Sequence, residues 1–349
     1  MQNSRNTPYL PPEWTPQSGV MLTWPHEHSD WCATLAEVEP VFVEIAHQIS
    51  LRERVVIACW DKEHLAHVEQ LLKHTDAILD QISLYAVPSN DTWARDHGPI
   101  TVLEEGNTPR LLDFTFNGWG DKFDAVLDNQ LTHRLHAAGA FNVTPLQNID
   151  VVLEGGSIEV DGAGTLLTTR RCLMSPMRNP HLDQHQIESL LGHLLGVDRF
   201  LWLDNGYLAG DDTDSHIDTL ARFCDARTIA YVACDDHHDE HYPELKAMEE
   251  ELKAFRTRGG QPYHLVPLPW PQAKYDEDGH RLPATYANFL IINGAVLVPV
   301  YDDPADEAAL ARIKDCFPQR EIIGIPCLPL IMQHGSLHCV TMQLPDGAL

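Results

Sequence analysis

A weak internal repeat is the feature of this sequence that most limits its fold. Three segments share one pattern, in which a polar residue is followed by an apolar run, a turn and a second apolar run. The segments are Glu154 to Thr169, His216 to Cys234 and Tyr286 to Val300. The turns have residues typical of β-hairpins: Asp161-Gly162-Ala163-Gly164, Cys224-Asp225-Ala226-Arg227 and Asn293-Gly294. The repeat predicts a protein built from several copies of one hairpin-containing unit.

Two further apolar runs also begin shortly after a polar residue. Asp96 stands before one of them and Cys339 before the other. The marked positions are then 96, 154, 216, 286 and 339, which lie 53 to 70 residues apart. This spacing predicts about five units of strands plus a helix, arranged around a centre. Each unit would direct one side chain inward, so the central pocket would be lined by Asp, Glu, His and Cys.

Apolar periodicity favours an α/β fold. Six stretches have the period of amphipathic helices: Ala36 to Ser50, Lys62 to Lys73, Asp124 to Ala138, His181 to Leu195, Pro243 to Thr257 and Ala305 to Cys316. Short β-rich runs lie between them: Val20 to Trp24, Val55 to Ala58, Ile100 to Leu103, Thr165 to Thr169, Ile229 to Ala233, Phe289 to Ile292 and Ala295 to Val300. Strands that alternate with helices predict an α/β protein. Two polar stretches, His237 to His241 and Gln272 to Gly279, are expected to be surface loops.

The charge of the chain narrows the classes of partner. The 349 residues include 24 Lys and Arg against 51 Asp and Glu, which gives a formal net charge of −27 at pH 7. Such a surface repels nucleic-acid phosphates and anionic lipid, so neither nucleic acid nor a membrane is expected as a partner, whereas small cations are attracted. The eight cysteines include no CxxC pair, which indicates a cytoplasmic protein with reduced thiols. No signal peptide or linker is visible, so one domain is expected over residues 1–349.

The segment around Cys339 offers a nucleophile. Gly335 and Ser336 precede it and allow a close approach to the strand that follows. Only the thiolate of a Cys attacks, so a catalytic Cys needs a base or a lowered pKa. The alternative is a buried Cys339 that acts as a small hydrophobic residue, which is the commoner role of a single Cys.

His216 and Asp218 lie two residues apart, after the acidic run Asp211-Asp212-Thr213-Asp214-Ser215. On a strand, the two side chains would face the same side and enter one pocket. A metal site is a competing interpretation because His-x-Asp occurs among metal ligands, but no second His stands at ligand spacing. A solvated acidic loop is the other alternative.

Two more carboxylates stand beside aromatic or apolar residues. In a turn before a strand, Trp93 could stack on a planar cation while Asp96 accepts two of its N–H bonds. The alternative there is a loop held by an ion pair between Arg95 and an aspartate. Glu154 ends an apolar run beside two glycines, where it could orient a His, hold a substrate nitrogen or cap a turn.

Together these residues supply a thiol, an imidazole and three carboxylates. The set suits attack on a carbon that carries positive charge and several N–H groups, and a guanidinium has both properties. Two carboxylates can bind its nitrogens and hold the carbon in front of the sulfur, while the bound cation stabilises the thiolate. The motifs GxSxG, GxGxxG, HExxH and the P-loop are absent, so serine esterase, hydride-transfer, zinc-protease and NTP chemistry lack their usual sequence support.

A series of short motifs runs in order along nearly the whole chain. They are Pro12-Glu13-Trp14, Trp24-Pro25, Trp93-x-Arg95-Asp96-x-Gly98-Pro99, Phe116-Asn117-x-Trp119-Gly120, Leu153-Glu154-Gly155-Gly156-Ser157, Thr165-Leu166-Leu167-Thr168-Thr169, Asp212-Thr213-x-x-His216-x-Asp218, Asn288-Phe289-Leu290-Ile291 with Asn293-Gly294, Phe317-Pro318-x-Arg320-Glu321 and Gly335-x-x-His338-Cys339-x-Thr341. In this combination the sequence resembles the guanidine-modifying superfamily, and within it the branch of agmatine deiminases and bacterial peptidylarginine deiminases. It departs from many agmatine deiminases at Ser215, where Gly is common, and at 334–338, where they have Gly-Gly-Gly-Asn-Ile-His before the Cys.

The resemblance implies a five-bladed α/β propeller (the pentein fold) with a central active-site pocket, formed by a single guanidine-modifying domain over residues 1–349. It implies that Cys339 attacks the guanidinium carbon. His216 would protonate the leaving ammonia and then activate water, and Glu154 would orient His216 and the substrate. Substrate binding is assigned to Trp93, Asp96, Trp119, Asp214 and Asp218. No metal and no other cofactor is implied.

The implied reaction converts agmatine to N-carbamoylputrescine and ammonia through a Cys-linked thiouronium, as a step of putrescine synthesis. Acidic residues before His216 favour agmatine, which ends in an ammonium group. An arginine or peptidylarginine deiminase stays open, because four residues could hold a substrate carboxylate: Arg110, Arg170, Arg171 and Arg178. An amidinotransferase, a metallohydrolase and a non-catalytic binding protein of the same fold are further alternatives. The oligomeric state is open, with a homo-oligomer among the options.

Overall fold

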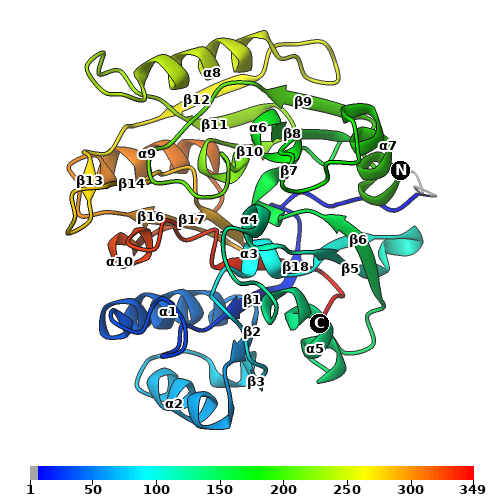
Figure 1. Cartoon of the computed structure of the whole chain (residues 1–349), viewed down its shortest axis with the longest axis vertical. Coiled ribbons are helices and arrows are strands. Elements are labelled where there is room, and N and C mark those ends of the chain that lie inside the picture. Colours follow the sequence, from blue (N-terminus) through cyan, green and yellow to red (C-terminus); the bar gives the residue numbers. More distant parts are fainter. Residues whose placement is uncertain (1–6) are drawn as a thin grey trace. The chain divides into compact units, whose positions relative to one another are not determined.

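The computed structural model describes residues 7–349, which form a mixed α/β fold with two compact units (Figure 1). The first unit contains residues 7–155 and 339–349, and the second contains residues 156–338. Each unit has its own sheets, helices and buried core. The predicted α/β class is confirmed.

The strands and helices of the first unit begin near the N-terminus and end with the last strand of the chain. Its strands are β1 (Gln17–Thr23), β2 (Arg54–Cys59), β3 (Ile82–Ala86), β4 (Ile100–Leu103), β5 (Pro109–Thr115), β6 (Leu146–Val152) and β18 (Thr341–Pro345). Its helices are α1 (Leu35–Ser50), α2 (Lys62–Lys73), α3 (Ala94–His97), α4 (Gly118–Asp121) and α5 (Leu131–Ala137). The core contains apolar side chains from several of these elements: Met21, Val56, Leu111, Leu135 and Leu344.

The second unit has the larger number of strands. They are β7 (Ile158–Val160), β8 (Thr165–Thr169), β9 (Arg199–Leu203), β10 (Ala221–Asp225), β11 (Thr228–Val232), β12 (His264–Leu268), β13 (Lys274–Tyr275), β14 (Arg281–Leu282), β15 (Leu290–Ile292), β16 (Ala295–Val300) and β17 (Glu321–Pro326). Its helices are α6 (Arg170–Leu173), α7 (Gln184–Leu195), α8 (Tyr242–Ala254), α9 (Asp306–Cys316) and α10 (Leu328–Ile331), with a 3₁₀ turn, η5, at Ile217–Thr219.

One strand connectivity recurs in five sheets of residues 7–349. In each, two strands pair antiparallel and the second pairs in parallel with a third strand, which the chain reaches through a helical crossover. The first unit contains the sheets β18–β1–β2–β3 and β4–β5–β6, and the second contains β7–β8–β9, β10–β11–β12 and β15–β16–β17. The predicted repeat of a hairpin-containing unit is therefore confirmed, because β7–β8, β10–β11 and β15–β16 are the three hairpins that it marked.

Local sequence signals explain where several elements begin and end. The side chain of Asp61 accepts the His64 backbone N–H at 2.8 Å and so caps α2. At the start of α7, Asp183 and Gln186 form a reciprocal capping box, and the helix ends at Gly196 in the left-handed conformation. The predicted bounds of α2, β4, β8 and β16 agree with the structure residue for residue.

Three predictions about local structure are wrong. The predicted helix from Asp124 to Ala138 is confined to α5 and a preceding 3₁₀ turn, because the Asp128 carboxylate turns back to accept the Asn90 backbone N–H at 2.6 Å. Gln272 to Gly279 is not only loop, since it contains β13, which pairs with β14. In the stretch 237–241, His241 is 1% exposed rather than a surface residue.

An ion pair lies in the core of the second unit. The Arg222 guanidinium, on β10, hydrogen-bonds Glu159 of β7 and donates to the Phe289 carbonyl oxygen at 2.6 Å. It also lies 4.7 Å from the centre of the Phe289 ring. Arg222 is fully buried, and such a charge is tolerated in a core only when it is paired. The pair joins two sheets of this unit, and Phe289 directly precedes β15 of a third.

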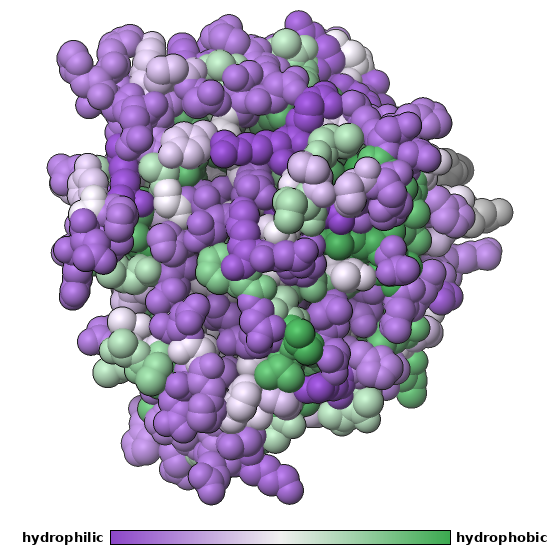
Figure 2. All heavy atoms as spheres, in the orientation of Figure 1, coloured by the Kyte–Doolittle hydropathy of each residue, from purple (hydrophilic) through white to green (hydrophobic). Residues whose placement is uncertain are grey.

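The surface is mainly polar, as the charged composition of the sequence predicts. Most side chains on the face shown in Figure 2 are hydrophilic. Among residues 7–349, no helix is both long enough and apolar enough to cross a membrane.

Two buried histidines predict acid sensitivity in the first unit. Burial lowers the pKa of His97 to about 3, and burial with repulsion from His64 and His28 lowers that of His26 to about 4. Burial also raises the pKa of Asp128, whose carboxyl lies 3.8 Å from the His97 ring. An unfolded His binds a proton below about pH 6.5, so between pH 6 and 4.5 unfolding takes up protons at both sites.

We therefore expect each of these histidines to contribute a fall of about 1.4 kcal/mol per pH unit to the free energy of unfolding as pH decreases from 6 to 4.5. Asp91 and Asp113, whose pKa burial raises to about 6, contribute in the opposite sense, so the histidine contribution is measured as a difference between variants. Urea titrations at pH 6.0, 5.5 and 5.0 measure the slope. The His97→Gln variant keeps a group that can hydrogen-bond Thr23, which lies 2.9 Å from the His97 ring, but cannot titrate. The pH dependence of its free energy of unfolding should lack the contribution of one proton, about 1.4 kcal/mol per pH unit. Equal slopes in the two proteins would contradict the prediction.

Candidate active site

Asp96 lies in the first unit on α3, the single helical turn that precedes β4. Its carboxylate is buried, and Oδ2 accepts the indole N–H of Trp119 at 2.9 Å. The Trp119 backbone is left-handed, with φ of 57°, which sets the direction of its ring. The Trp93 ring meets the Trp119 ring edge-on at 6.4 Å between centroids. A carboxylate beside two indoles is a suitable environment for a planar cation.

Cys339 lies in the same unit, two residues before β18, and is 5% exposed. Its carbonyl oxygen accepts the Arg95 backbone N–H at 3.1 Å. Because Arg95 precedes Asp96, this hydrogen bond brings the chain segments of the predicted nucleophile and of one predicted guanidinium-binding carboxylate side by side. The sequence also allowed a loop held by an ion pair between Arg95 and an aspartate. In the structure, the Arg95 guanidinium lies 3.7 Å from the carboxylate of Glu13, so this partner is a glutamate.

Glu154 is fully buried and follows β6 in the first unit. The next residue, Gly155, approaches the Arg95 carbonyl oxygen so closely that a Cβ atom would lie 2.3 Å from it. No residue with a side chain fits at that distance, which explains one of the two glycines after the carboxylate. The close approach brings the Glu154 segment to the same Arg95–Asp96 turn.

His216 and Asp218 lie in the second unit, 1% and 0% exposed. They are not on a strand as predicted, because Asp218 is on η5 and His216 caps it. Local hydroxyl groups favour this turn over an extended chain: Thr219 Oγ1 donates to the His216 carbonyl at 2.8 Å, and the His216 backbone N–H donates to Thr213 Oγ1 at 3.1 Å. Strand alternation is therefore not the reason that the two residues share a buried site.

The acidic run before His216 folds as a tight loop rather than a solvated one. The Asp211 carboxylate accepts the backbone N–H of Ser215 at 2.7 Å, and burial raises the pKa of Asp211. Ser215 has a left-handed backbone, with φ of 65°. A left-handed residue favours glycine, which accounts for the Gly that is common at this position of the resembling branch.

Asp214, assigned to substrate binding, is bound by another residue of the second unit. Arg178 Nη1 lies 2.6 Å from Asp214 Oδ2, and Arg178 Nη2 donates to the Thr213 carbonyl at 2.9 Å. Two other arginines named for a substrate carboxylate are also paired, Arg110 with Glu104 at 2.8 Å and Arg170 with Asp204 at 2.5 Å. The role of Asp214 in substrate binding stays a prediction.

Two residues near Asp218 were quoted only as parts of motifs and were not predicted as site residues. His338 Nδ1 lies 2.7 Å from Asp218 Oδ2, and the Asn288 side-chain amide donates to the Asp218 carbonyl at 3.3 Å. These contacts join residues 120 and 70 positions apart. The only sequence signal was the presence of His338 and Asn288 in motifs that resemble those of the deiminases.

One further potential metal ligand, Cys172, lies near His216 in the second unit. Cys172 Sγ and a ring nitrogen of His216 lie within 4.8 Å of one another.

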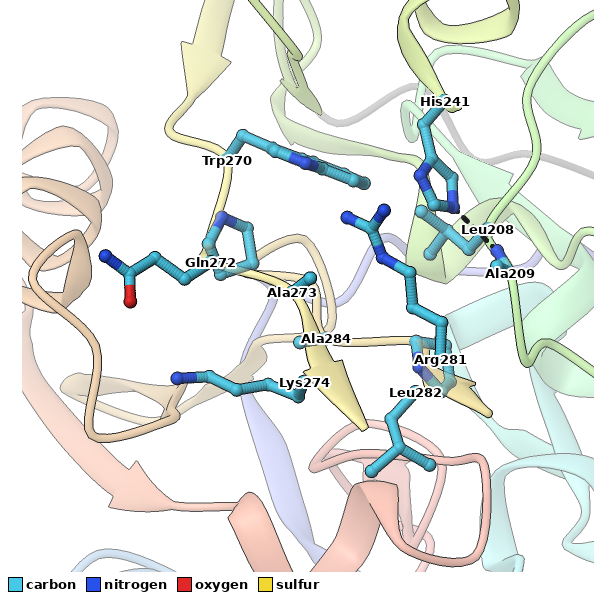
Figure 3. A pocket seen from close by; sticks show the side chains of 12 residues that line it. Leu208, Ala209, His241, Trp270, Gln272, Ala273, Lys274, Arg281, Leu282 and Ala284 are labelled. Carbon is cyan, nitrogen blue, oxygen red and sulfur yellow. Dashed lines mark hydrogen bonds between the residues drawn. The ribbon is translucent and has the colours of Figure 1, made fainter. Parts of the chain in front are cut away.

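A pocket in the second unit is occupied by the protein's own guanidinium (Figure 3). The Arg281 side chain lies beneath the Trp270 ring, 5.8 Å from its centre, and makes two hydrogen bonds to Asp239 at 2.7 and 3.2 Å. His241 Nδ1 lies 2.6 Å from the same carboxylate, and its Nε2 accepts the Ala209 N–H. Burial favours neutral Asp239, but bonds from Arg281, His241 and Trp270 outweigh it and lower its pKa. The pocket contains no predicted site residue.

Comparison with known proteins gives the family. A family model for Porphyromonas-type peptidyl-arginine deiminases matches residues 9–345. The chain belongs to this family. A relative from Selenomonas ruminantium, named "putative agmatine deiminase", is 33% identical over 97% of this chain and 95% of its own length.

Solved structures of similar proteins cover almost the whole chain. One, described as the "putative arginine deiminase from Porphyromonas gingivalis", is 54% identical with a TM-score of 0.92 and covers 98% of this chain and 99% of its own. Another is a Cys-to-Ser form of the C. jejuni agmatine deiminase with substrate bound, 38% identical with a TM-score of 0.90 and 99% coverage of both chains. This family member is therefore an enzyme, a hydrolase that acts on guanidino C–N bonds.

Proposed function

We propose that this deiminase hydrolyses agmatine to N-carbamoylputrescine and ammonia. The observation that carries the choice of agmatine is the pairing of its arginines. Of the four arginines considered for the carboxylate of an arginine substrate, Arg110, Arg170 and Arg178 are each engaged by a carboxylate of the protein. The fourth, Arg171, lies over the Tyr207 ring, 5.8 Å from its centre, and stays open as a candidate. The relatives named for agmatine support the same choice.

We propose a two-stage reaction on Cys339. Asp96 and Asp218 bind the guanidinium nitrogens and hold the carbon before the thiolate. The sulfur–carbon bond forms, the carbon–nitrogen bond breaks, and His216 gives its proton to the ammonia that leaves. A covalent thiouronium remains on the sulfur.

In the second stage, His216 takes a proton from water, the resulting hydroxide attacks the thiouronium carbon, and the sulfur departs. The product is a ureido compound, and Cys339 is regenerated. Glu154 orients His216 and the substrate, while Trp93, Trp119 and Asp214 complete the substrate site. The indole N–H that Trp119 donates to Asp96, and the short path from Asp96 to the Cys339 backbone through Arg95, support this assignment of the first unit.

The wider proposal concerns fold and setting. The shared connectivity of the five sheets supports a five-fold α/β propeller formed by one domain over residues 1–349. The reaction would serve putrescine synthesis in the cytoplasm, without a metal, and the enzyme would act alone or as a homo-oligomer.

An arginine or peptidylarginine deiminase is the second candidate, favoured by the name of the 54% identical structure. Release of ammonia and of ureido product, measured with agmatine, free arginine and a peptide ending in arginine, separates the two. We expect kcat/KM for agmatine to exceed the others by at least about tenfold, a difference of about 1.4 kcal/mol in transition-state binding.

A preference for either arginine substrate would keep the proposed chemistry and change the substrate. The assay is repeated after chelation, and a loss of activity that added metal restores would favour a metallohydrolase. Transfer of the amidino group to an added amine would instead favour an amidinotransferase.

A further inference from the structure

The His338 side chain makes a buried contact with Asp218. Nδ1 lies 2.7 Å from Oδ2, and the two side chains are 3% and 0% exposed. A carboxylate can only accept a hydrogen bond, so the ring donates and its proton resides on Nδ1. We propose that His338 is a positioning residue, which fixes the Asp218 carboxylate in the orientation that binds the guanidinium of the substrate. The inference rests on the proposed role of Asp218.

The backbones of the two residues are joined as well as their side chains. The His338 N–H donates to Asn288 Oδ1 at 2.8 Å, and the Asn288 amide nitrogen donates to the Asp218 carbonyl oxygen at 3.3 Å. Asn288 therefore fixes the distance between the two backbones, and the imidazole fixes the carboxylate. All three residues are buried and belong to the second unit.

The geometry of guanidinium recognition gives this hydrogen bond a function beyond packing. A carboxylate turns readily about its Cβ–Cγ bond, because such a torsion has only broad minima. A planar guanidinium binds well only when the carboxylate lies near its plane. A donor held at one oxygen removes that freedom before substrate arrives, so less entropy is lost on binding.

His338 and Cys339 are consecutive in the sequence, so the proposed nucleophile directly follows the residue that orients the carboxylate. A side chain that merely filled space at 338 would need no donor. An imidazole that acted on the substrate itself would need Nδ1 or Nε2 directed at the reacting carbon. Because Nδ1 is committed to Asp218, that nitrogen acts on the carboxylate and not on the substrate.

Three variants separate positioning from packing. His338→Asn places an amide N–H near the site of Nδ1, His338→Gln places it one carbon further away, and His338→Leu has similar bulk without a donor. With agmatine, we expect kcat/KM to fall roughly 10- to 100-fold in the Leu and Gln variants, the range typical of residues that orient a ligand-binding group, and less than about fivefold in the Asn variant. Equal losses in Asn and Leu variants of matching thermal stability would overturn the inference.

A double-mutant cycle tests the link to Asp218. Agmatine is titrated calorimetrically into the Cys339→Ser protein and into the same protein carrying His338→Leu, Asp218→Asn or both. We expect His338→Leu to weaken binding at least about fivefold beside Asp218, and to have no further effect beside Asn at 218. If the Leu variant does not fold, His338→Gln takes its place in the cycle.

Additive effects in the cycle, with agmatine turnover by the unchanged enzyme intact, would overturn the positioning role alone. If the unchanged enzyme turns over only an arginine substrate, the cycle is run with that substrate and read in the same way. If it turns over none of the three guanidines, the proposed function fails, and the role of His338 fails with it.

Discussion

Replacing Cys339 by Ser should reduce deimination of agmatine by roughly 10³-fold or more, the scale of loss when a covalent nucleophile is removed. The hydroxyl is a far weaker nucleophile than a thiolate, and it is so much weaker an acid than a thiol that it stays protonated at neutral pH even beside the bound guanidinium. Substrate should still bind, since both proposed guanidinium-binding carboxylates remain. Steady-state ammonia release gives kcat, and calorimetric titration of the variant with agmatine gives the affinity.

The matched control is Cys32→Ser, because Cys32 is an exposed cysteine of the same unit. It should leave kcat within about twofold, as surface substitutions away from a site normally do. Acid quenching of the unchanged enzyme during turnover should also trap a mass increase on the peptide that contains Cys339. Full activity in the Cys339→Ser protein, or an adduct on another cysteine, would refute the assignment of the nucleophile.

Replacing Asp96 by Asn should have the next largest effect. A buried carboxylate that pairs with a substrate cation contributes about 2–5 kcal/mol, so kcat/KM should fall roughly 30- to 5,000-fold. The amide has nearly the same shape, but it lacks the charge, and if its oxygen accepts the Trp119 indole N–H, its NH2 donor faces the substrate cation. Kinetics with agmatine over a range that includes high concentrations separates the effect on KM from that on kcat.

Trp119→Phe is the matched control for Asp96. It keeps an aromatic ring but removes part of the indole, including the N–H that donates to the carboxylate at 2.9 Å. Loss of one such bond is worth about 1 kcal/mol, or roughly fivefold in kcat/KM. If Asp96→Asn were as mild as Trp119→Phe, Asp96 would serve the loop and not the substrate.

Short-range signals predicted those parts of the fold that depend on neighbouring residues. Helix α2 has a capping Asp61 and a clear apolar stripe, β8 is buried throughout and β16 is buried except at its last residue, so their bounds follow from the sequence. Of the third strands, β2 was predicted as Val55 to Ala58, whereas β6, β9, β12 and β17 were missed. In β6, three of seven residues are exposed and only Ile149 is buried, and the apolar run before Glu154 includes only the last two residues of the strand. Its pairing with β5 depends on distant contacts that a local pattern does not contain.

The sequence likewise predicted some features of the candidate site and not others. The residue types around Asp96, His216 and Cys339 indicated guanidinium chemistry, and the structure places Asp96 beside the Cys339 backbone. The turn that contains Asp218 was predicted as a strand, because its hydroxyl-to-backbone bonds are not visible in an apolar pattern. His338 was not predicted as a site residue for a related reason. Its proposed role depends on Asp218, which lies 120 residues away in the sequence, and no local pattern around His338 indicates that contact.

The pairing of β1 with β18 sets the order in which the protein can be completed during synthesis. The sheet that begins at Gln17 lacks its antiparallel partner until Thr341–Pro345 has been translated, whereas every residue of the second unit has already been added by then. The edge of β1 that pairs with β18 therefore stays unpaired for almost the entire duration of translation. Since the proposed nucleophile comes only two residues before β18, we expect a chain truncated before Cys339 to be inactive. Activity and completion of the first sheet would then depend on the same segment, Cys339 to Pro345.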